Sequence, residues 1–145
     1  ASPRRSPFSP TSPRNQVHAR WATDSRTPRS RSIRSAELRC MTKVTFSVHD
    51  GLITGFHITG HSSRSSRDEE GRIVCSAVSS AAYLVANTVT DVIGASADAA
   101  ADDGDMHLEI RSHLSDCQPI MKGMVLHMKE LASQYEDRIR VYSEV

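Results

Sequence analysis

A histidine and a cysteine frame a polar loop in the middle of the chain. His61 follows Gly60 at the end of an extended segment, and Cys75 lies near the start of an apolar helical segment, with residues 62–70 between them. A thiol reacts at neutral pH when a base takes its proton and its surroundings favour the anion. The first turn of a helix favours an anion because its backbone N–H groups are unpaired. The pair therefore predicts nucleophilic thiol chemistry, with His61 as base and Cys75 as nucleophile.

Each of these side chains also has an ordinary structural explanation. A free cysteine is often a small buried hydrophobe, and a loop histidine can hydrogen-bond to backbone. A zinc site would combine Cys75 with His57, His61 or His113, but none of these pairs has the close spacing of structural zinc sites. The acidic residues within 96–105 lack the spaced oxygen ligands of a calcium loop. We expect no metal and no cofactor.

The segment before His61 predicts a β-hairpin. Residues 44–49 alternate apolar and polar side chains, Asp50-Gly51 is typical of a tight turn, and residues 52–59 alternate again. The histidine is therefore expected just past the second strand.

A helix is predicted after the loop. Apolar residues recur at helical spacing from Val74 to Val92, and Gly94 is placed to end the helix. Residues 96–105 are small and acidic, which predicts a surface loop.

The last forty residues predict a strand, a helix and a strand. Residues 106–114 alternate, residues 120–135 carry a helical apolar stripe with a cap within residues 115–117, and residues 138–142 alternate again. The order ββαβαβ predicts an α+β domain. We expect a mostly antiparallel four-stranded sheet with two helices packed on one face.

Charge divides the chain at Met41. Residues 1–40 hold nine Arg, no Lys and two acidic residues, a net charge of +7, together with five of the six prolines. Residues 41–145 hold nine basic and fifteen acidic residues, a net charge of −6. The first segment has too few apolar residues to offset the entropy of ordering, so we expect a disordered extension that is not part of the native domain.

Three interpretations of residues 1–40 remain open. The composition is typical of an organelle transit peptide, a basic arm can bind RNA, and the segment can be translated upstream sequence or an artefact. We favour the last, with Met41 as the true start, because a strand pattern follows Met41 directly. No continuous apolar run predicts a signal peptide or a membrane span, and Cys40, Cys75 and Cys117 form no disulfide framework. We expect a soluble cytoplasmic domain.

The central motif resembles a known family. Gly60-His61, a variable loop, Gly71 and residues 73–79 (Ile-Val-Cys-Ser-Ala-Val-Ser) are similar to the pattern of the ribosomal-processing cysteine proteases called Prp. That pattern is Gly-His, a loop, and Gly-x-Asp-Ile-Val-Cys-Ala-Ala-Val-Ser. The resemblance covers nearly all of residues 41–145.

The resemblance implies a Cys-His dyad and a substrate. His61 would be the base and Cys75 the nucleophile, with Gly60, Ser76 and Ser79 in supporting positions. The implied function is removal of the N-terminal extension of large-subunit ribosomal protein 27 by a cytoplasmic homodimer, without a nucleic-acid or membrane partner. The backbone N–H groups of Cys75 and Ser76 would stabilise the oxyanion.

This chain departs from the family pattern before the cysteine. Arg72 stands where the family has Asp, and Gly71 lies one position closer to the cysteine. We expect Asp68 or Glu70 to replace the missing carboxylate, and residues 62–72 to order over a bound peptide. A noncatalytic ribosome-assembly or binding module of the same fold is the alternative function.

Overall fold

The predicted hairpin opens the part of the chain that this computed structural model describes, residues 41–145. Strand β1 (Thr42–His49) pairs antiparallel with β2 (Leu52–Thr59). Asp50 and Gly51 both have positive φ, the conformation of a tight hairpin turn whose twist matches that of its strands. The expectations for residues 1–40 lie outside the described residues.

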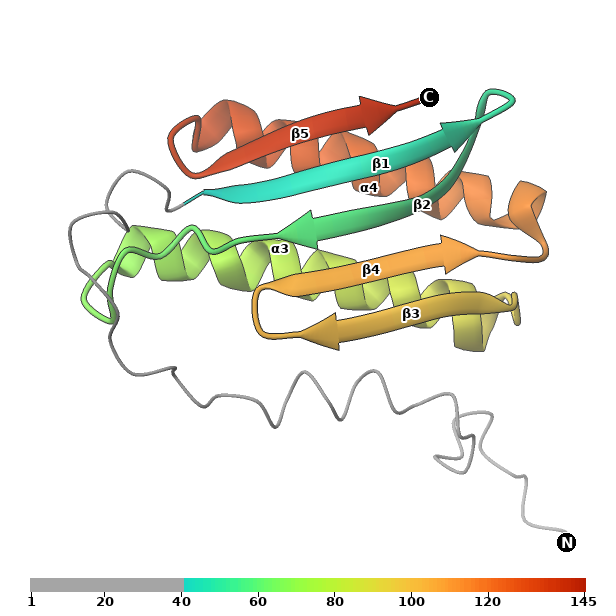
Figure 1. Ribbon diagram of the computed structural model, residues 1–145, viewed down its shortest axis with the longest axis horizontal. Coiled ribbons are helices and arrows are strands. Elements are labelled where there is room, and N and C mark those ends of the chain that lie inside the picture. The colour runs from blue at the N-terminus through green and yellow to red at the C-terminus, as the bar shows by residue number, and fades with distance from the viewer. Residues whose placement is uncertain (1–40) are drawn as a thin grey trace, which may run out of the picture.

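The remaining elements follow the order helix, two strands, helix and strand. They are α3 (Glu69–Asn87), a short π-helical extension η2 (Thr88–Val92), β3 (Ala97–Asp102), β4 (Asp105–Ile110), α4 (Leu114–Gln134) and β5 (Ile139–Glu144). Figure 1 shows the sheet in front and both long helices behind it, so the two helices cover one face. The predicted α+β class is confirmed.

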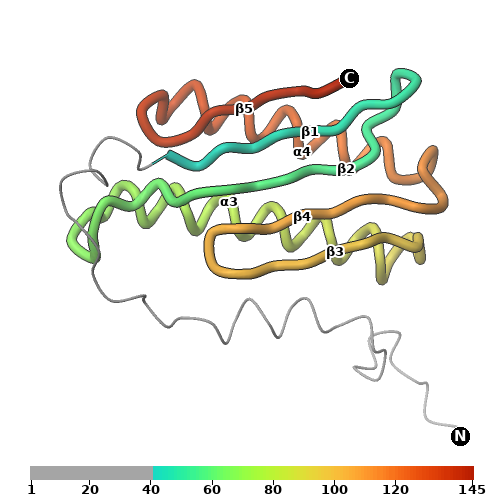
Figure 2. Tube along the Cα trace, in the orientation of Figure 1, coloured from blue at the N-terminus to red at the C-terminus, as the bar shows by residue number. Residues whose placement is uncertain are grey.

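The sheet has the strand order β3-β4-β2-β1-β5, which can be followed along the trace in Figure 2. Three neighbouring pairs are antiparallel, and β5 runs parallel to β1. The parallel pair arises because α4 carries the chain from β4 across the back of the sheet to its far edge. The start of β5 therefore lies beside the start of β1, close to the loop after β2.

The prediction of four strands is wrong, because a fifth strand forms within the expected surface loop. Residues 97–102 read Ala-Asp-Ala-Ala-Ala-Asp and pair antiparallel with β4. Alanine and aspartate are depleted in strands, so local preference gives no signal. The segment forms a strand because it can pair with the hydrogen-bonding edge of β4. As a result, Asp103 and Gly104 occupy a hairpin turn that lies beside the loop after β2.

Both helices begin earlier than predicted. Helix α3 begins at Glu69 with Asp68 as its N-cap, and the Asp68 side chain accepts a hydrogen bond from the Gly71 N–H at 3.1 Å. Helix α4 begins at Leu114 after His113, which has a left-handed φ of 54°, and not at a cap within residues 115–117. The polar first turn of α3 hid its start from the apolar periodicity, and the start of α4 was hidden because Leu114 continued the alternating pattern of the strand before it.

The hydrophobic core lies between the sheet and the helices. Alternate residues of the strands, such as Val44 and Phe46, meet the inner faces of the helices, where Val74, Val78 and Met121 are fully or almost fully buried. Burial of each large apolar side chain is worth about 1.5–3 kcal/mol relative to exposure. This packing fixes both the long axis of α3 and the end of β2, which together carry the dyad.

One helical stretch is long and apolar enough to cross a membrane by length and composition. It is Glu69–Val92 within the described residues, with a mean hydropathy of 1.5. The expectation that no stretch is this apolar is therefore corrected. Its inner face supplies Val74, Val78, Ala82 and Val85 to the core, which is how the core helix of a folded domain reaches such a hydropathy.

Candidate active site

The fold brings the predicted histidine and cysteine together. Gly60 directly follows β2 and has φ +85°, and a Cβ there would lie 2.4 Å from the Met41 carbonyl oxygen, so only glycine fits this bend. The Gly60 N–H donates to the Gly104 carbonyl at 2.9 Å. The bend directs His61 toward Cys75 on α3, close enough for each group to shift the pKa of the other. The His61 side chain is about half exposed.

The contact moves the pKa values of both groups toward an ion pair. Hydrogen bonding with Cys75 raises the pKa of His61; partial burial lowers it, and the charges of Asp103 and Cys75 add to the rise. Partial burial by itself would raise the pKa of the Cys75 thiol. Hydrogen bonds from His61 and from the backbone N–H groups of Ser62 and Ser63 outweigh burial, and the thiol pKa is lowered.

The thiol is therefore activated by the loop and not by the helix start. Because α3 begins at Glu69, Cys75 lies in its second turn, beyond the N–H groups that are unpaired. The N–H groups of Cys75 and Ser76 belong to the hydrogen-bond ladder of the helix, so the expectation that they stabilise the oxyanion is wrong. The donor that reaches the sulfur comes from the loop: the Ser62 N–H donates to Cys75 Sγ at 3.2 Å.

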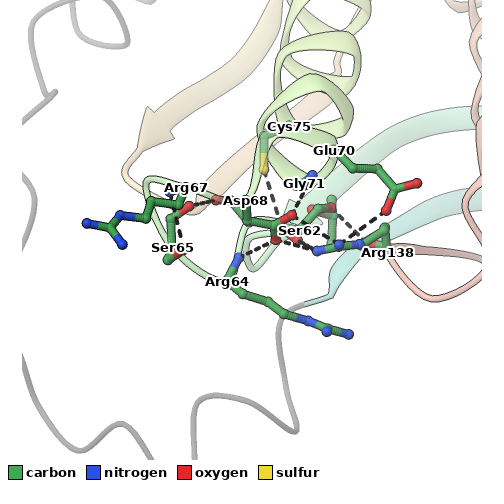
Figure 3. A network of polar contacts seen from close by, with 11 residues as sticks. Ser62, Arg64, Ser65, Arg67, Asp68, Glu70, Gly71, Cys75 and Arg138 are labelled. Atoms are coloured by element: carbon green, nitrogen blue, oxygen red, sulfur yellow. Dashed lines mark hydrogen bonds and ion pairs between the residues drawn. The ribbon is translucent and has the colours of Figure 1, made fainter.

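The loop is tied down by a network around Arg138, shown in Figure 3. Arg138 binds both carboxylate oxygens of Asp68 and also contacts Glu70 at 3.2 Å. The Arg138 and Asp68 side chains are only 11% and 12% exposed. The hydrogen bond from Arg138 lowers the pKa of Asp68 to about 2, helped by the backbone N–H groups of Arg64 and Gly71. Asp68 thus joins the loop to Arg138 and to the start of α3.

The carboxylate that faces the histidine is Asp103. Its Oδ1 lies 3.4 Å from His61 Nε2, in the turn between β3 and β4. A Cβ at Gly104 would lie 2.7 Å from the same nitrogen, so glycine lets the imidazole pack against this turn. Asp103, and not Asp68 or Glu70, is the carboxylate that contacts the histidine, because Arg138 engages the other two. In the sequence, Asp103 was indicated only by the Asp103-Gly104 pair, which is typical of a turn.

The other predicted site residues lie around this centre. Arg72 is exposed and donates to the Ser66 carbonyl oxygen at 3.3 Å. Ser76 is exposed, and Ser79 is partly buried one turn beyond Cys75. Within residues 41–145, the Ser79 hydroxyl makes no hydrogen bond to either member of the dyad.

The histidines considered for zinc lie elsewhere. His57 contacts Asp105 at 3.0 Å on the open face of the sheet, and His113 contacts the Ser112 hydroxyl at 3.0 Å. The described residues contain no group of three His, Cys, Asp or Glu side chains that could hold a metal.

Comparison with known proteins connects this geometry to a family. The family model of the cysteine protease Prp matches residues 41–140. Two structures of the ribosomal processing protease Prp from S. aureus, one with a substrate peptide and one with a covalently linked product peptide, have TM-scores of 0.64. They are 21% and 22% identical to this chain, and each alignment covers 72% of this chain and 100% of the other.

A third structure has the same fold. The Streptococcus mutans protein SMU.848 is 21% identical with a TM-score of 0.62, over 71% of this chain and 93% of the other. No curated protein sequence matches the chain significantly.

Proposed function

Because the chain belongs to the family of the cysteine protease Prp and is itself a cysteine protease, we propose that it cuts a ribosomal protein precursor with His61 and Cys75 as its catalytic dyad. The substrate proposed is large-subunit ribosomal protein 27, from which the enzyme removes an N-terminal extension. The assignment is supported by the position of His61 next to Cys75, where each group shifts the pKa of the other toward an ion pair and the Ser62 N–H donates to Cys75 Sγ. The S. aureus protein of the same fold is a ribosomal processing protease and binds a substrate peptide.

The chemistry follows from the positions of these groups. His61 accepts the Cys75 proton, and the thiolate attacks the scissile carbonyl to form a C–S bond. The Ser62 N–H lies 3.2 Å from the sulfur, so it is our candidate donor to the oxyanion that develops when the sulfur attacks. The imidazolium then protonates the leaving amine, and the C–N bond breaks. Water hydrolyses the acyl-enzyme with His61 as base.

Electrostatics suits a basic substrate. Residues 41–145 carry a net charge of −6, and the turn beside His61 contains Asp103, with Asp102 and Asp105 on the strands that flank it. A positively charged ribosomal protein segment would be attracted to this surface, and opposite potentials speed encounter. The reaction needs no cofactor, membrane or nucleic acid, and we place it in the cytoplasm.

We also propose that the enzyme is a homodimer. An apolar groove of about 400 Å³ lies between α3 and α4, and its lining includes Ala81, Leu84, Ile120 and Met124. The Leu84 side chain on its border is 64% exposed. Such a surface favours burial against a partner. Sedimentation across micromolar concentrations should give twice the mass of one chain, and the mass of a single chain would contradict the proposal.

Cleavage of a peptide that spans the extension tests the function directly. The full chain should cut the peptide at one site, and Cys75→Ala should abolish cleavage without loss of cooperative unfolding. Cys117→Ala removes the buried thiol and should leave cleavage in place, which makes it the matched control. Binding of the peptide without cleavage by the unchanged protein would instead favour the noncatalytic module.

A further inference from the structure

We propose that Arg138 is a positioning residue for the nucleophile, because it holds the loop backbone that faces the sulfur of Cys75. Arg138 lies just before β5 and is 76 residues from the loop residue Ser62, whose carbonyl oxygen it contacts. The inference rests on the proposed function for its effect on cleavage. Its effect on the thiol can be measured without a substrate.

Arg138 contacts the loop at its beginning and at its end. Its Nη1 donates to the Ser62 carbonyl oxygen at 2.9 Å, and its Nη2 donates to Asp68 Oδ1 at 3.0 Å. Ser62 follows His61, and Asp68 is the N-cap of α3. One mostly buried guanidinium therefore sets the distance between the end of β2 and the start of the helix that carries Cys75.

The contact with Ser62 acts on a peptide unit that faces the thiol. The Ser62 carbonyl and the Ser63 N–H belong to one planar trans peptide, so the two groups point in opposite directions. Arg138 binds the carbonyl on one side, and the Ser63 N–H is directed to the other side, where it helps to lower the pKa of the Cys75 thiol. A charged donor on the carbonyl also polarises the N–H and strengthens it as a donor.

The Ser62 side chain fixes the preceding peptide in the same way. Ser62 is fully buried, and its hydroxyl donates to the Arg138 carbonyl oxygen at 2.7 Å and contacts Thr42 Oγ1 at 2.6 Å. Its own N–H then lies 3.2 Å from Cys75 Sγ. The Ser62 N–H on the sulfur is thus held by the junction of β1 with the residue before β5.

Helix α3 closes the remaining side of this peptide. A Cβ at Gly71 would lie 2.6 Å from the Ser62 carbonyl oxygen and 2.6 Å from the Ser63 Cα. The peptide is therefore packed between the Gly71 backbone and the Arg138 guanidinium. A lysine could supply the charge at position 138, but it could not bind Asp68 and the Ser62 carbonyl with a rigid planar fork.

The test measures the Cys75 thiol pKa from the pH dependence of alkylation in the full chain, with the modified peptide identified by mass spectrometry. Arg138→Gln should raise the thiol pKa, and alkylation at about pH 6.5 should fall about tenfold for each pKa unit gained. Arg138→Lys should give a smaller rise. Arg140→Gln removes an exposed arginine from β5 and should change nothing.

The Asp68→Asn change distinguishes the effect of anchoring the loop from the effect of a nearby charge on the thiol pKa. Loss of a negative charge near the thiol would by itself lower the thiol pKa, whereas loss of the Arg138 anchor should raise it. His61, which faces the thiol, and Asp103, which faces His61, are unchanged in all these variants. Peptide cleavage should fall in parallel with the loss of thiolate.

A folded Arg138→Gln protein with an unchanged thiol pKa, or a lower thiol pKa in Asp68→Asn, would overturn the proposal. If Arg138→Gln does not unfold cooperatively, Arg138→Lys and Asp68→Asn carry the same test. Should the unchanged protein have a low thiol pKa but cut no peptide, the proposed function fails while the positioning role of Arg138 stands.

Discussion

Two cysteines of the described residues have opposite surroundings. The Cys75 thiol pKa is lowered by hydrogen bonds from His61 and the loop N–H groups against the opposing effect of burial, whereas burial raises the pKa of Cys117. We predict that Cys75 alkylates much faster than Cys117 at about pH 6.5, and that His61→Ala removes most of this difference. Peptide mapping after a short exposure to iodoacetamide measures it. Equal, slow alkylation of both thiols would contradict the dyad.

The same pKa shifts set the pH range of catalysis. The lowered thiol pKa extends the thiolate form to lower pH, and the raised His61 pKa extends the imidazolium form to higher pH. Asp103 helps to set the alkaline limit of this range, because its negative charge raises the pKa of His61. The catalytic rate should therefore be nearly constant over a broad pH range. Removal of the Asp103 charge should shorten this range at its alkaline end.

Asp103→Asn tests this contribution. Both side chains are partly exposed, so the pair is worth about 0.2–1 kcal/mol, and kcat/KM should fall about 1.5- to 5-fold. The alkaline limb of the pH profile should move to lower pH, as should the His61 pKa followed by NMR. Asp102→Asn removes the same charge from an exposed neighbour and should leave both values unchanged. Equal effects of the two changes would argue against a specific role for Asp103.

At the scale of elements, the Asp68–Arg138 pair joins α3 to β5. The folded-state pKa of Asp68 is about 2, below its ordinary value, so the stability from this pair is present above the ordinary pKa. It is lost as pH falls from about 4 to about 2. We predict that Asp68→Asn lowers the melting temperature at neutral pH and that its difference from the unchanged protein shrinks across this range. A constant difference would contradict the assignment.

Two glycines should respond to alanine in opposite directions. A Cβ at Gly55 in β2 would lie 2.1 Å from the Leu108 carbonyl oxygen, so Gly55→Ala forces β2 and β4 apart and should destabilise the domain. A Cβ at Gly123 in α4 would meet nothing within 4 Å. Gly123→Ala should stabilise the protein by about 0.5–1 kcal/mol through helix propensity. Denaturant midpoints measure both, and two changes of the same sign would refute the prediction.

At the scale of the whole molecule, the described residues contain the core, the sheet and the dyad. The family model also matches only within them, over residues 41–140. We predict that a chain beginning at Met41 keeps its cooperative unfolding transition, its fast Cys75 alkylation and its peptide cleavage. Calorimetry and the alkylation assay compare it with the full chain. Loss of the transition would show that residues 1–40 contribute to the fold.

The sequence alone determined the features that rest on local pattern. Alternation and the Asp50-Gly51 turn predicted the first hairpin, helical periodicity predicted the two helices, and the spacing of Gly60-His61 and Cys75 indicated the family. These signals are local because side-chain direction repeats every two residues in a strand and every 3.6 residues in a helix. The family match and the α+β class confirm them.

Only the tertiary structure decided how the dyad is surrounded. Strand β3 forms because β4 offers it an edge, and its turn then places Asp103 beside His61. Arg138 reaches Ser62 because β5 pairs with β1, although 76 residues separate the two. Contacts of this kind depend on strand order and helix crossing, which no short stretch of sequence encodes. The residues that hold the loop were therefore visible in the sequence, but their partners were not.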